Sequence, residues 1–148
     1  MLANVADHVK LIQINNNKEP ITKIYNHYLA ETRATNDADI LIFMHADVSM
    51  DIIHLLQSID DCKDKYDVIG LCGTATFNVS QSPLNWFTGS NPTPARRWGC
   101  VTHGEVGNQT SFFSQHSPDV TDHEVACIDG LCIAFCPKAL QSDMCFDE

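Results

Sequence analysis

Residues 40–51 are Ile-Leu-Ile-Phe-Met-His-Ala-Asp-Val-Ser-Met-Asp, and this stretch decides the fold. Its apolar run ends at Met44 and is followed by His45 and Asp47. A run this short and this apolar is typical of a strand buried on both faces, as in a parallel sheet. Because open α/β sheets bind ligands beyond the carboxyl ends of their strands, His45 and Asp47 are candidate ligand-binding residues.

Two interpretations of Asp47 are open at this point. A carboxylate oxygen is a hard ligand that suits Mg²⁺ or Mn²⁺, and a metal ion here could hold a diphosphate. Alternatively, His45 and Asp47 merely cap the helix that follows, a role that Ser49 or Asp51 could also fill. The residue types alone do not decide between the two.

The segments before this strand alternate between strand and helix patterns. Residues 9–14 predict a strand, which Asn15 and Asn16 end. Pro20 then stands at the first turn of a predicted helix. The apolar stripe of that helix has the spacing i, i+3, i+4, i+7 and i+8, and it consists of Ile21, Ile24, Tyr25, Tyr28 and Leu29.

The segments after the strand continue the alternation. A helix is predicted at about 50–61 and a third strand at 67–73. This order predicts right-handed βαβ units, and hence an α/β domain with a mostly parallel sheet flanked by helices. Further on, two strand segments surround Asp129 and Gly130, where a hairpin turn is the simplest interpretation. Pro137 is expected to start a last helix.

Residues 74–122 hold both tryptophans and are rich in proline and glycine. We expect a long irregular segment of the kind that is usually functional or mobile. Arg96 and Arg97 stand next to Trp98. A solvated basic pair beside a packing indole is the simpler interpretation. A phosphate or acceptor contact is the functional one, since arginine suits phosphate geometry.

Length and charge limit the classes of protein to consider. A chain of 148 residues predicts one domain, spanning residues 1–148. The net charge of −10 argues against non-specific nucleic-acid binding, but it permits a nucleotide whose phosphate charge a divalent cation offsets. No apolar stretch approaches the roughly 20 residues of a membrane span. The seven cysteines include no Cys-x-x-Cys pair, and free thiols packed in a core fit a reducing, cytoplasmic location.

Six short motifs are spread in order along nearly the whole chain. They are Ile21-Thr-Lys-Ile-Tyr25-Asn26, Phe43-Met-His45-Ala-Asp47-Val48, Gly70-Leu-Cys-Gly73, Trp86 or Trp98, Ile128-Asp129-Gly130-Leu131 and Phe146-Asp147-Glu148. This ordered set resembles the family 2-like nucleotide-sugar glycosyltransferases of the GT-A fold, a Rossmann-like α/β fold. Within them, it is most similar to the branch typified by a streptomycin-biosynthesis protein.

The resemblance implies a donor site at the end of the apolar strand. His45-Ala46-Asp47 would take the place of the Asp-x-Asp metal motif, with Asp47 binding the Mn²⁺ or Mg²⁺ that holds the diphosphate of a nucleotide sugar. His45 would contact ribose or sugar, or complete the metal site. Asn15 and Asn16 would end the strand that flanks the nucleotide.

The resemblance also implies the chemistry. The activity would be transfer of the sugar to an unknown hydroxyl acceptor, with inversion at the anomeric carbon and a carboxylate taking the acceptor proton. Asp129 would lie near the donor sugar or the acceptor, and Asp147 and Glu148 are the competing carboxylates, with Asp147 taken as the second catalytic candidate.

The chain differs from the family pattern at both ends. The strand at 9–14 matches the family's second strand, so the usual first strand, which grips the base, is expected to be missing. The chain also stops at Glu148, before the acidic stretch that commonly supplies the base. The expectation is therefore a truncated or minimal GT-A-like domain. Two alternatives are a catalytically inactive binding domain and a nucleotidyltransferase-like Rossmann enzyme.

Overall fold

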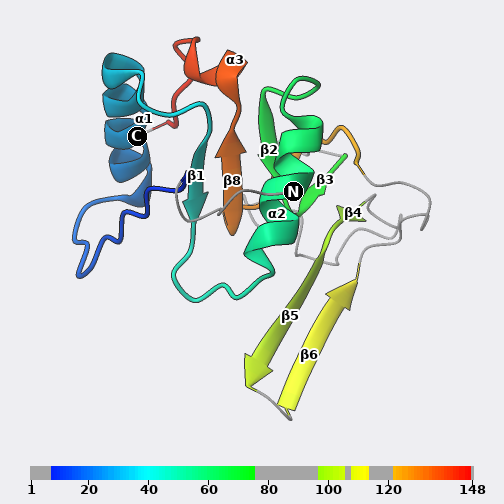
Figure 1. Cartoon of the computed structure of the whole chain (residues 1–148). Coiled ribbons are helices and arrows are strands. Elements are labelled where there is room, and N and C mark those ends of the chain that lie inside the picture. The colour runs from blue at the N-terminus through cyan, green and yellow to red at the C-terminus, as the bar shows by residue number, and fades with distance from the viewer. Residues whose placement is uncertain (1–7, 76–96, 106–107, 114–121, 148) are drawn as a thin grey trace.

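Three helices and eight strands make up the part of the chain that the structure describes, residues 8–75, 97–105, 108–113 and 122–147 (Figure 1). The structure is a computed structural model. The helices are α1 (Ile21–Thr35), α2 (Ile52–Cys62) and α3 (Pro137–Leu140). The strands are β1 (Leu41–Met44), β2 (Val68–Gly70), β3 (Gly73–Thr74), β4 (Arg97–Trp98), β5 (Cys100–Glu105), β6 (Asn108–Phe113), β7 (Cys127–Ile128) and β8 (Cys132–Phe135).

Local sequence signals explain the limits of the helices. α1 follows Pro20, whose ring fixes a backbone angle suited to a helix start. It ends at Asn36, which is left-handed with φ 51° and donates its N–H to the Thr32 carbonyl oxygen. α3 begins with Pro137 at its first position. The three predicted helices are therefore confirmed. Among the described residues, no helix is long and apolar enough to cross a membrane.

The central sheet has the strand order β1-β8-β2, and both of its strand pairs are antiparallel. Phe135 of β8 lies opposite Leu41 on one side and opposite Val68 on the other. β1 and β2, which α2 connects, therefore run in the same direction without pairing to each other. The described residues confirm a mixed architecture of helices and strands. The prediction of a mostly parallel sheet is wrong for the described strands, because β8 comes from far along the chain and occupies the place between β1 and β2.

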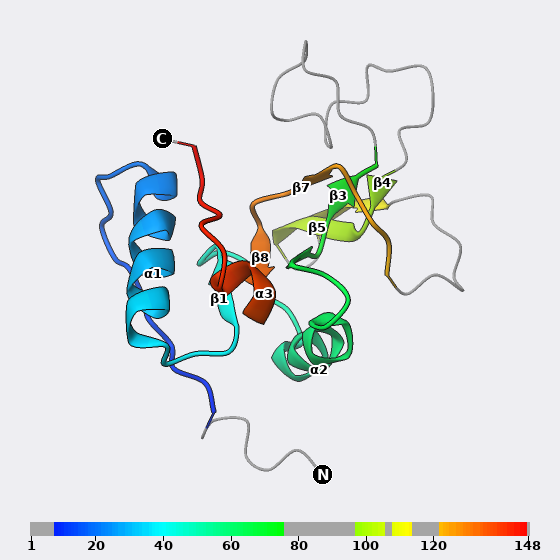
Figure 2. The same cartoon turned by 90° about the horizontal axis from the view of Figure 1, so that it is seen from above.

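α1 and α2 cover opposite faces of this sheet (Figure 2). The core on the α1 face includes Tyr25, Leu29, Phe43, Ile133 and Phe135. The core on the α2 face consists of Leu55, Ile59, Cys132 and Ala134, with Ile40 and Ile42 packed against it. Successive residues of β1 and β8 thus alternate between the two faces, as strand geometry requires. The prediction that the run at 40–44 is a strand packed on both faces is confirmed.

A second sheet has the order β4-β3-β7, and β5 and β6 form a hairpin of their own. The segment that was expected to be irregular, residues 74–122, is therefore partly regular. Gly99, between β4 and β5, has φ 100°, which favours glycine at this position. Trp86 and Arg96 lie outside the described residues.

The hairpin predicted around Asp129 and Gly130 is wrong. β7 pairs with β3 in the second sheet, whereas β8 pairs with β1 and β2 in the central sheet. Both edges of β8 are occupied, so no edge is left for β7. Gly130 also lacks the positive φ that a two-residue type I′ turn requires. Residues 129–131 instead carry the chain from one sheet to the other.

Residues 9–14 do not form the predicted strand. They have no strand partner among the described residues, and their apolar side chains are 44–83% exposed. An apolar run becomes a strand only where a neighbour accepts its backbone hydrogen bonds. Here Asn16 adopts a left-handed conformation with φ 54°, and Asn17 exchanges two hydrogen bonds with Glu19, at 2.7 and 2.9 Å. These local features direct the chain into α1 instead.

Candidate active site

The carboxyl end of β1 meets two other turns of the chain. The backbone N–H of His45 donates to the carbonyl oxygen of Leu131, just before β8, at 3.1 Å. The N–H of Asp129 donates to the carbonyl oxygen of Cys72, just past β2, at 2.8 Å. These bonds bring the turns after β1, after β2 and before β8 to one end of the central sheet. We call this end the carboxyl edge and define it by His45, Asp47, Cys72 and Asp129.

Asp51 caps α2, which decides one of the open alternatives. Its Oδ1 accepts hydrogen bonds from the backbone N–H groups of Ile53 and His54, both at 3.1 Å. Asp51 therefore fills the capping role, and His45 and Asp47 do not. Both of these side chains are exposed, and neither makes a hydrogen bond or an ion pair within the described part of the chain.

The donor set at His45 and Asp47 fits a metal ion that is shared with a ligand. The described residues contain no group of three or more His, Cys, Asp and Glu side chains that could hold a metal ion by themselves. Mg²⁺, however, commonly uses one or two carboxylates and completes its coordination with water and substrate phosphates. The N–H of Val48 donates to the His45 carbonyl oxygen at 3.2 Å, so one tight exposed turn carries both side chains.

Gly70 and Gly73 allow β7 to approach the carboxyl edge closely. A Cβ atom on Gly70 would lie 1.9 Å from Cγ2 of Ile128, and one on Gly73 would lie 2.6 Å from the carbonyl oxygen of Cys127. Larger residues at either position would push β7 away from β3, with which it pairs. The Gly-x-x-Gly motif thus helps to set the position of Asp129, which directly follows Ile128.

The Asp129 carboxylate is half-buried and stabilises the turn before β8. Its Oδ1 accepts a hydrogen bond from the N–H of Leu131 at 2.9 Å. This is the local turn that aspartate commonly makes with the backbone two residues on. One carboxylate oxygen therefore has a structural role, and the expected contact with the donor sugar or acceptor, which stays a prediction, would fall to the other.

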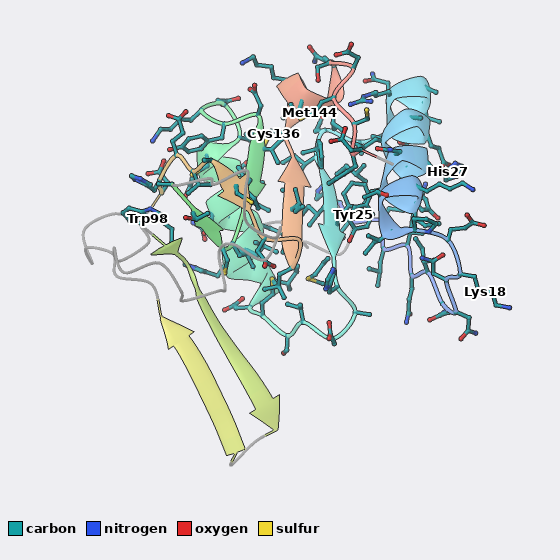
Figure 3. All side chains as sticks on the ribbon, turned by 180° about the vertical axis from the view of Figure 1, so that it is seen from behind. Lys18, Tyr25, His27, Trp98, Cys136 and Met144 are labelled. Carbon is teal, nitrogen blue, oxygen red and sulfur yellow. The ribbon has the colours of Figure 1, made fainter. Side chains whose placement is uncertain are left out.

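Asp147 follows an aromatic residue that is anchored in the core. The ring of Phe146 lies 5.3 Å from Tyr25, 6.2 Å from Phe43 and 5.6 Å from Phe135, measured between ring centroids (Tyr25 is labelled in Figure 3). Phe43 lies two residues before His45, whereas Phe135 lies opposite Leu41 and Val68, at the end of the sheet away from the carboxyl edge. Asp147 itself is exposed, and its catalytic role stays a prediction. Glu148 lies outside the described residues.

Asn26 has a role in this region that sequence analysis did not assign. Its side-chain amide makes hydrogen bonds with both backbone groups of Phe146. The available signal was the Tyr-Asn pair of the first motif, where a polar residue directly follows the buried Tyr25. Its partner, 120 residues away, could not be identified without the fold.

Asn15 and Asn16 are not presented to the carboxyl edge by a strand. Both are exposed in the stretch before α1, and Asn15 accepts a hydrogen bond from the side chain of Gln13 at 3.2 Å. The strand that was expected to place them beside the nucleotide is absent from the described residues. Their contact with the nucleotide therefore rests on the resemblance alone.

Two further features are a pocket next to the candidate catalytic residues and the packing of Trp98. Ile128 and Phe146, which precede the two candidate catalytic carboxylates, both line a pocket of about 300 Å³ whose other walls are apolar or sulfur-containing. The ring of Trp98 stacks on that of His123, with 3.8 Å between centroids, which supports its interpretation as a packing indole. The side chain of Arg97 lies outside the described part of the structure.

Burial decides which groups near the carboxyl edge can exchange protons at neutral pH. It raises the pKa of the Cys132 thiol on the α2 face. On the α1 face, burial and then the nearby Cys132 raise the pKa of the Tyr25 hydroxyl. Both groups stay protonated at neutral pH, so neither is a candidate base. That role is left to the carboxylates at the surface.

A family model for a glycosyltransferase-like family matches residues 5–148. The match spans nearly the whole chain, and the chain belongs to this family. Neither a search of curated proteins nor a search of solved structures found a match. Membership points to glycosyl transfer in general terms, and the branch typified by the streptomycin-biosynthesis protein stays a prediction.

Proposed function

We propose that the chain transfers a sugar from a nucleotide-diphosphate sugar, bound at the carboxyl edge, to a hydroxyl acceptor. One observation carries this proposal: Asp51 caps α2, while His45 and Asp47 remain exposed at the carboxyl end of β1. At this position of an α/β sheet, polar side chains without a structural role favour a ligand. Family membership supports a glycosyl donor as that ligand.

On the donor side, Asp47 and His45 would hold Mn²⁺ or Mg²⁺. The ion, when bound, supplies positive charge that stabilises the diphosphate as it leaves. The chain's own contribution is orientation. The bond from His45 N–H to the Leu131 carbonyl oxygen fixes the turn that carries both side chains, and it ties this turn to the one that carries Asp129.

On the acceptor side, a carboxylate would take the proton of the hydroxyl group. The acceptor oxygen bonds to the anomeric carbon, the bond from that carbon to the phosphate oxygen breaks, and the nucleoside diphosphate leaves, which inverts the anomeric configuration. Asp129 and Asp147 are the two candidates for this base. The apolar pocket lined by Ile128 and Phe146, the residues that precede these two carboxylates, offers space for an acceptor.

The test compares two aspartates on opposite ends of one strand. Asp47→Asn should weaken the Mn²⁺-dependent binding of nucleoside diphosphates by about 1–3 kcal/mol, the scale of a lost charged contact. Asp39→Asn, an exposed change of equal charge before the amino end of β1, is the control and should leave binding unchanged. Isothermal calorimetry with several nucleoside diphosphates measures the difference, and equal binding by both variants would overturn the assignment of Asp47.

Activity measurements separate the remaining alternatives. Release of nucleoside diphosphate from a panel of nucleotide sugars and acceptors supports transfer. Binding without release on any donor would favour a catalytically inactive binding domain. Turnover of nucleoside triphosphates with release of pyrophosphate would favour a nucleotidyltransferase.

A further inference from the structure

Two polar side chains of α1 bind the backbone of the C-terminal segment. The Nδ2 of Asn26 donates to the carbonyl oxygen of Phe146 at 2.9 Å, and the N–H of Phe146 donates back to Oδ1 of Asn26 at 2.8 Å. The Nε of Arg33 donates to the carbonyl oxygen of Leu140 at 3.1 Å, and its guanidinium also donates to that of Met144. α1 therefore holds this segment by its backbone as well as by its side chains.

These contacts give the segment a direction. Asn26 and Arg33 are seven residues apart in the sequence, which is about 10 Å along a helix. Arg33 contacts Met144 and Asn26 contacts Phe146, so the segment runs toward the N-terminal end of α1. α1 runs opposite to β1 (Figure 1), so the segment runs in the same direction as β1 along the α1 face.

We propose that Asn26 is a positioning residue for Asp147. Its amide binds the N–H and the carbonyl oxygen of Phe146 and so sets the direction in which the Asp147 carboxylate, one residue further on, points. This role rests on the proposed function, in which Asp147 is a candidate base. Segments near a chain end are poorly ordered unless they are tied down, and small misplacements of a catalytic group cost much of its rate.

Packing of the Phe146 ring does not by itself require this amide. The ring is already held by Tyr25, Phe43 and Phe135, with centroid distances of 5.3–6.2 Å. Such contacts anchor a side chain but leave rotation of the following peptide less restricted. The hydrogen bonds to the N–H and C=O of Phe146 fix the peptide groups on both sides of this residue, and the orientation of the second group decides where the next carboxylate points.

The first experiment needs neither donor nor metal. Amide hydrogen exchange at Phe146 should be about fivefold faster in Asn26→Ala than in the wild-type chain, since the lost acceptor is worth about 1 kcal/mol. Asn26→Asp keeps the acceptor for this N–H and should give an intermediate rate. His27→Ala changes a neighbouring side chain that is 69% exposed; it is the control and should leave the exchange rate at Phe146 unchanged. Unchanged exchange in Asn26→Ala would overturn the proposal.

The second experiment separates positioning from general stability. Asn26→Ala should lower kcat for sugar transfer by about 10- to 100-fold with the donor KM unchanged, a scale typical of a misplaced catalytic group. In an Asp147→Asn background the same change should have no further effect on kcat. Additive losses would show that Asn26 acts independently of Asp147 and would overturn the proposal. If the wild-type chain transfers no sugar, the proposed function and the positioning role both fail, while the exchange rates still decide whether Asn26 fixes the segment.

Discussion

The two faces of the central sheet are held in different ways. On the α1 face, aromatic rings pack against the sheet, and Asn26 and Arg33 bind the backbone of the C-terminal segment. On the α2 face, aliphatic and small residues such as Ile59 and Ala134 pack together, and Asp51 makes its hydrogen bonds within α2 itself. The α1 face therefore connects the core to part of the candidate site. Changes on this face should affect stability and the site together, whereas changes on the α2 face should affect stability alone.

The largest expected effect comes from emptying the α1 face. Phe43→Ala removes a 7% exposed ring that lies 4.0 Å from the Tyr25 ring, and it should lower the free energy of unfolding by about 3–5 kcal/mol. Ile59→Ala on the α2 face should cost about 2–5 kcal/mol. Urea unfolding measures both. Only Phe43→Ala should also speed amide exchange at Phe146 beyond what global unfolding explains. Equal acceleration of exchange at Phe146 by both variants would contradict the proposed difference between the two faces.

A smaller effect is expected where β7 crosses the end of β2. Gly70→Ala places a Cβ atom against Ile128, so it should cost about 1–3 kcal/mol by overpacking and should displace Asp129. Gly130→Ala is the matched control, because a Cβ atom there has no neighbour within 4 Å and the residue lacks a positive φ. The control should stay within about 0.5 kcal/mol of the wild-type chain in urea unfolding. Equal free energies of unfolding for the two variants would mean that β7 shifts to accommodate the added Cβ atom at no cost in stability.

The smallest expected effect is a difference between the two faces in the pH at which they lower the free energy of unfolding. Burial raises the pKa of the Cys132 thiol on the α2 face above its value of about 8.5 in the unfolded chain. The unfolded state then loses this proton at a lower pH than the folded state. The free energy of unfolding should therefore fall as the pH rises from about 8.5 through the folded pKa. Tyr25 on the α1 face should add to this fall only above about pH 10.

Two cysteine variants test this pH dependence. Cys132→Ala should make the decline in stability between about pH 8.5 and pH 10 less steep, as followed by urea unfolding at several pH values. Part of the decline should remain, because burial also raises the pKa of the Cys136 and Cys62 thiols. Cys145→Ala, at an exposed position, should leave the decline as it is. The same slope in both variants would contradict the role of the buried thiol.

The three helices and β1 could be predicted because their sequence signals are local. The apolar stripe of α1, the start of α3 at Pro137 and the apolar run of β1 each lie within a few residues. Sheet order could not be predicted, since the place of β8 between β1 and β2 depends on segments about 65 to 90 residues apart. Residues 9–14 carry a strand-like pattern too, but they lack a partner among the described residues.

The candidate site could likewise be predicted from the sequence only in part. His45 and Asp47 could be identified because they directly follow an apolar run, and the fold does place them at a strand end. Their neighbours across the carboxyl edge depend on tertiary contacts. The roles of Gly70 and Asn26 depend on Ile128 and Phe146, which lie far along the chain. No local sequence pattern indicates that Gly70 contacts Ile128 or that Asn26 contacts Phe146.

The most direct test of the central claim locates the bound ion and nucleotide by NMR. Mn²⁺ is paramagnetic, and together with a nucleoside diphosphate it should broaden the backbone amide signals nearest to it. The account predicts the strongest broadening at residues 45–48 and 129–131 and little in α3, which follows the opposite end of β8. Asp47→Asn should reduce this broadening at the same concentrations of ion and nucleotide. Broadening centred elsewhere, or an unchanged pattern in Asp47→Asn, would contradict a donor site at the carboxyl edge.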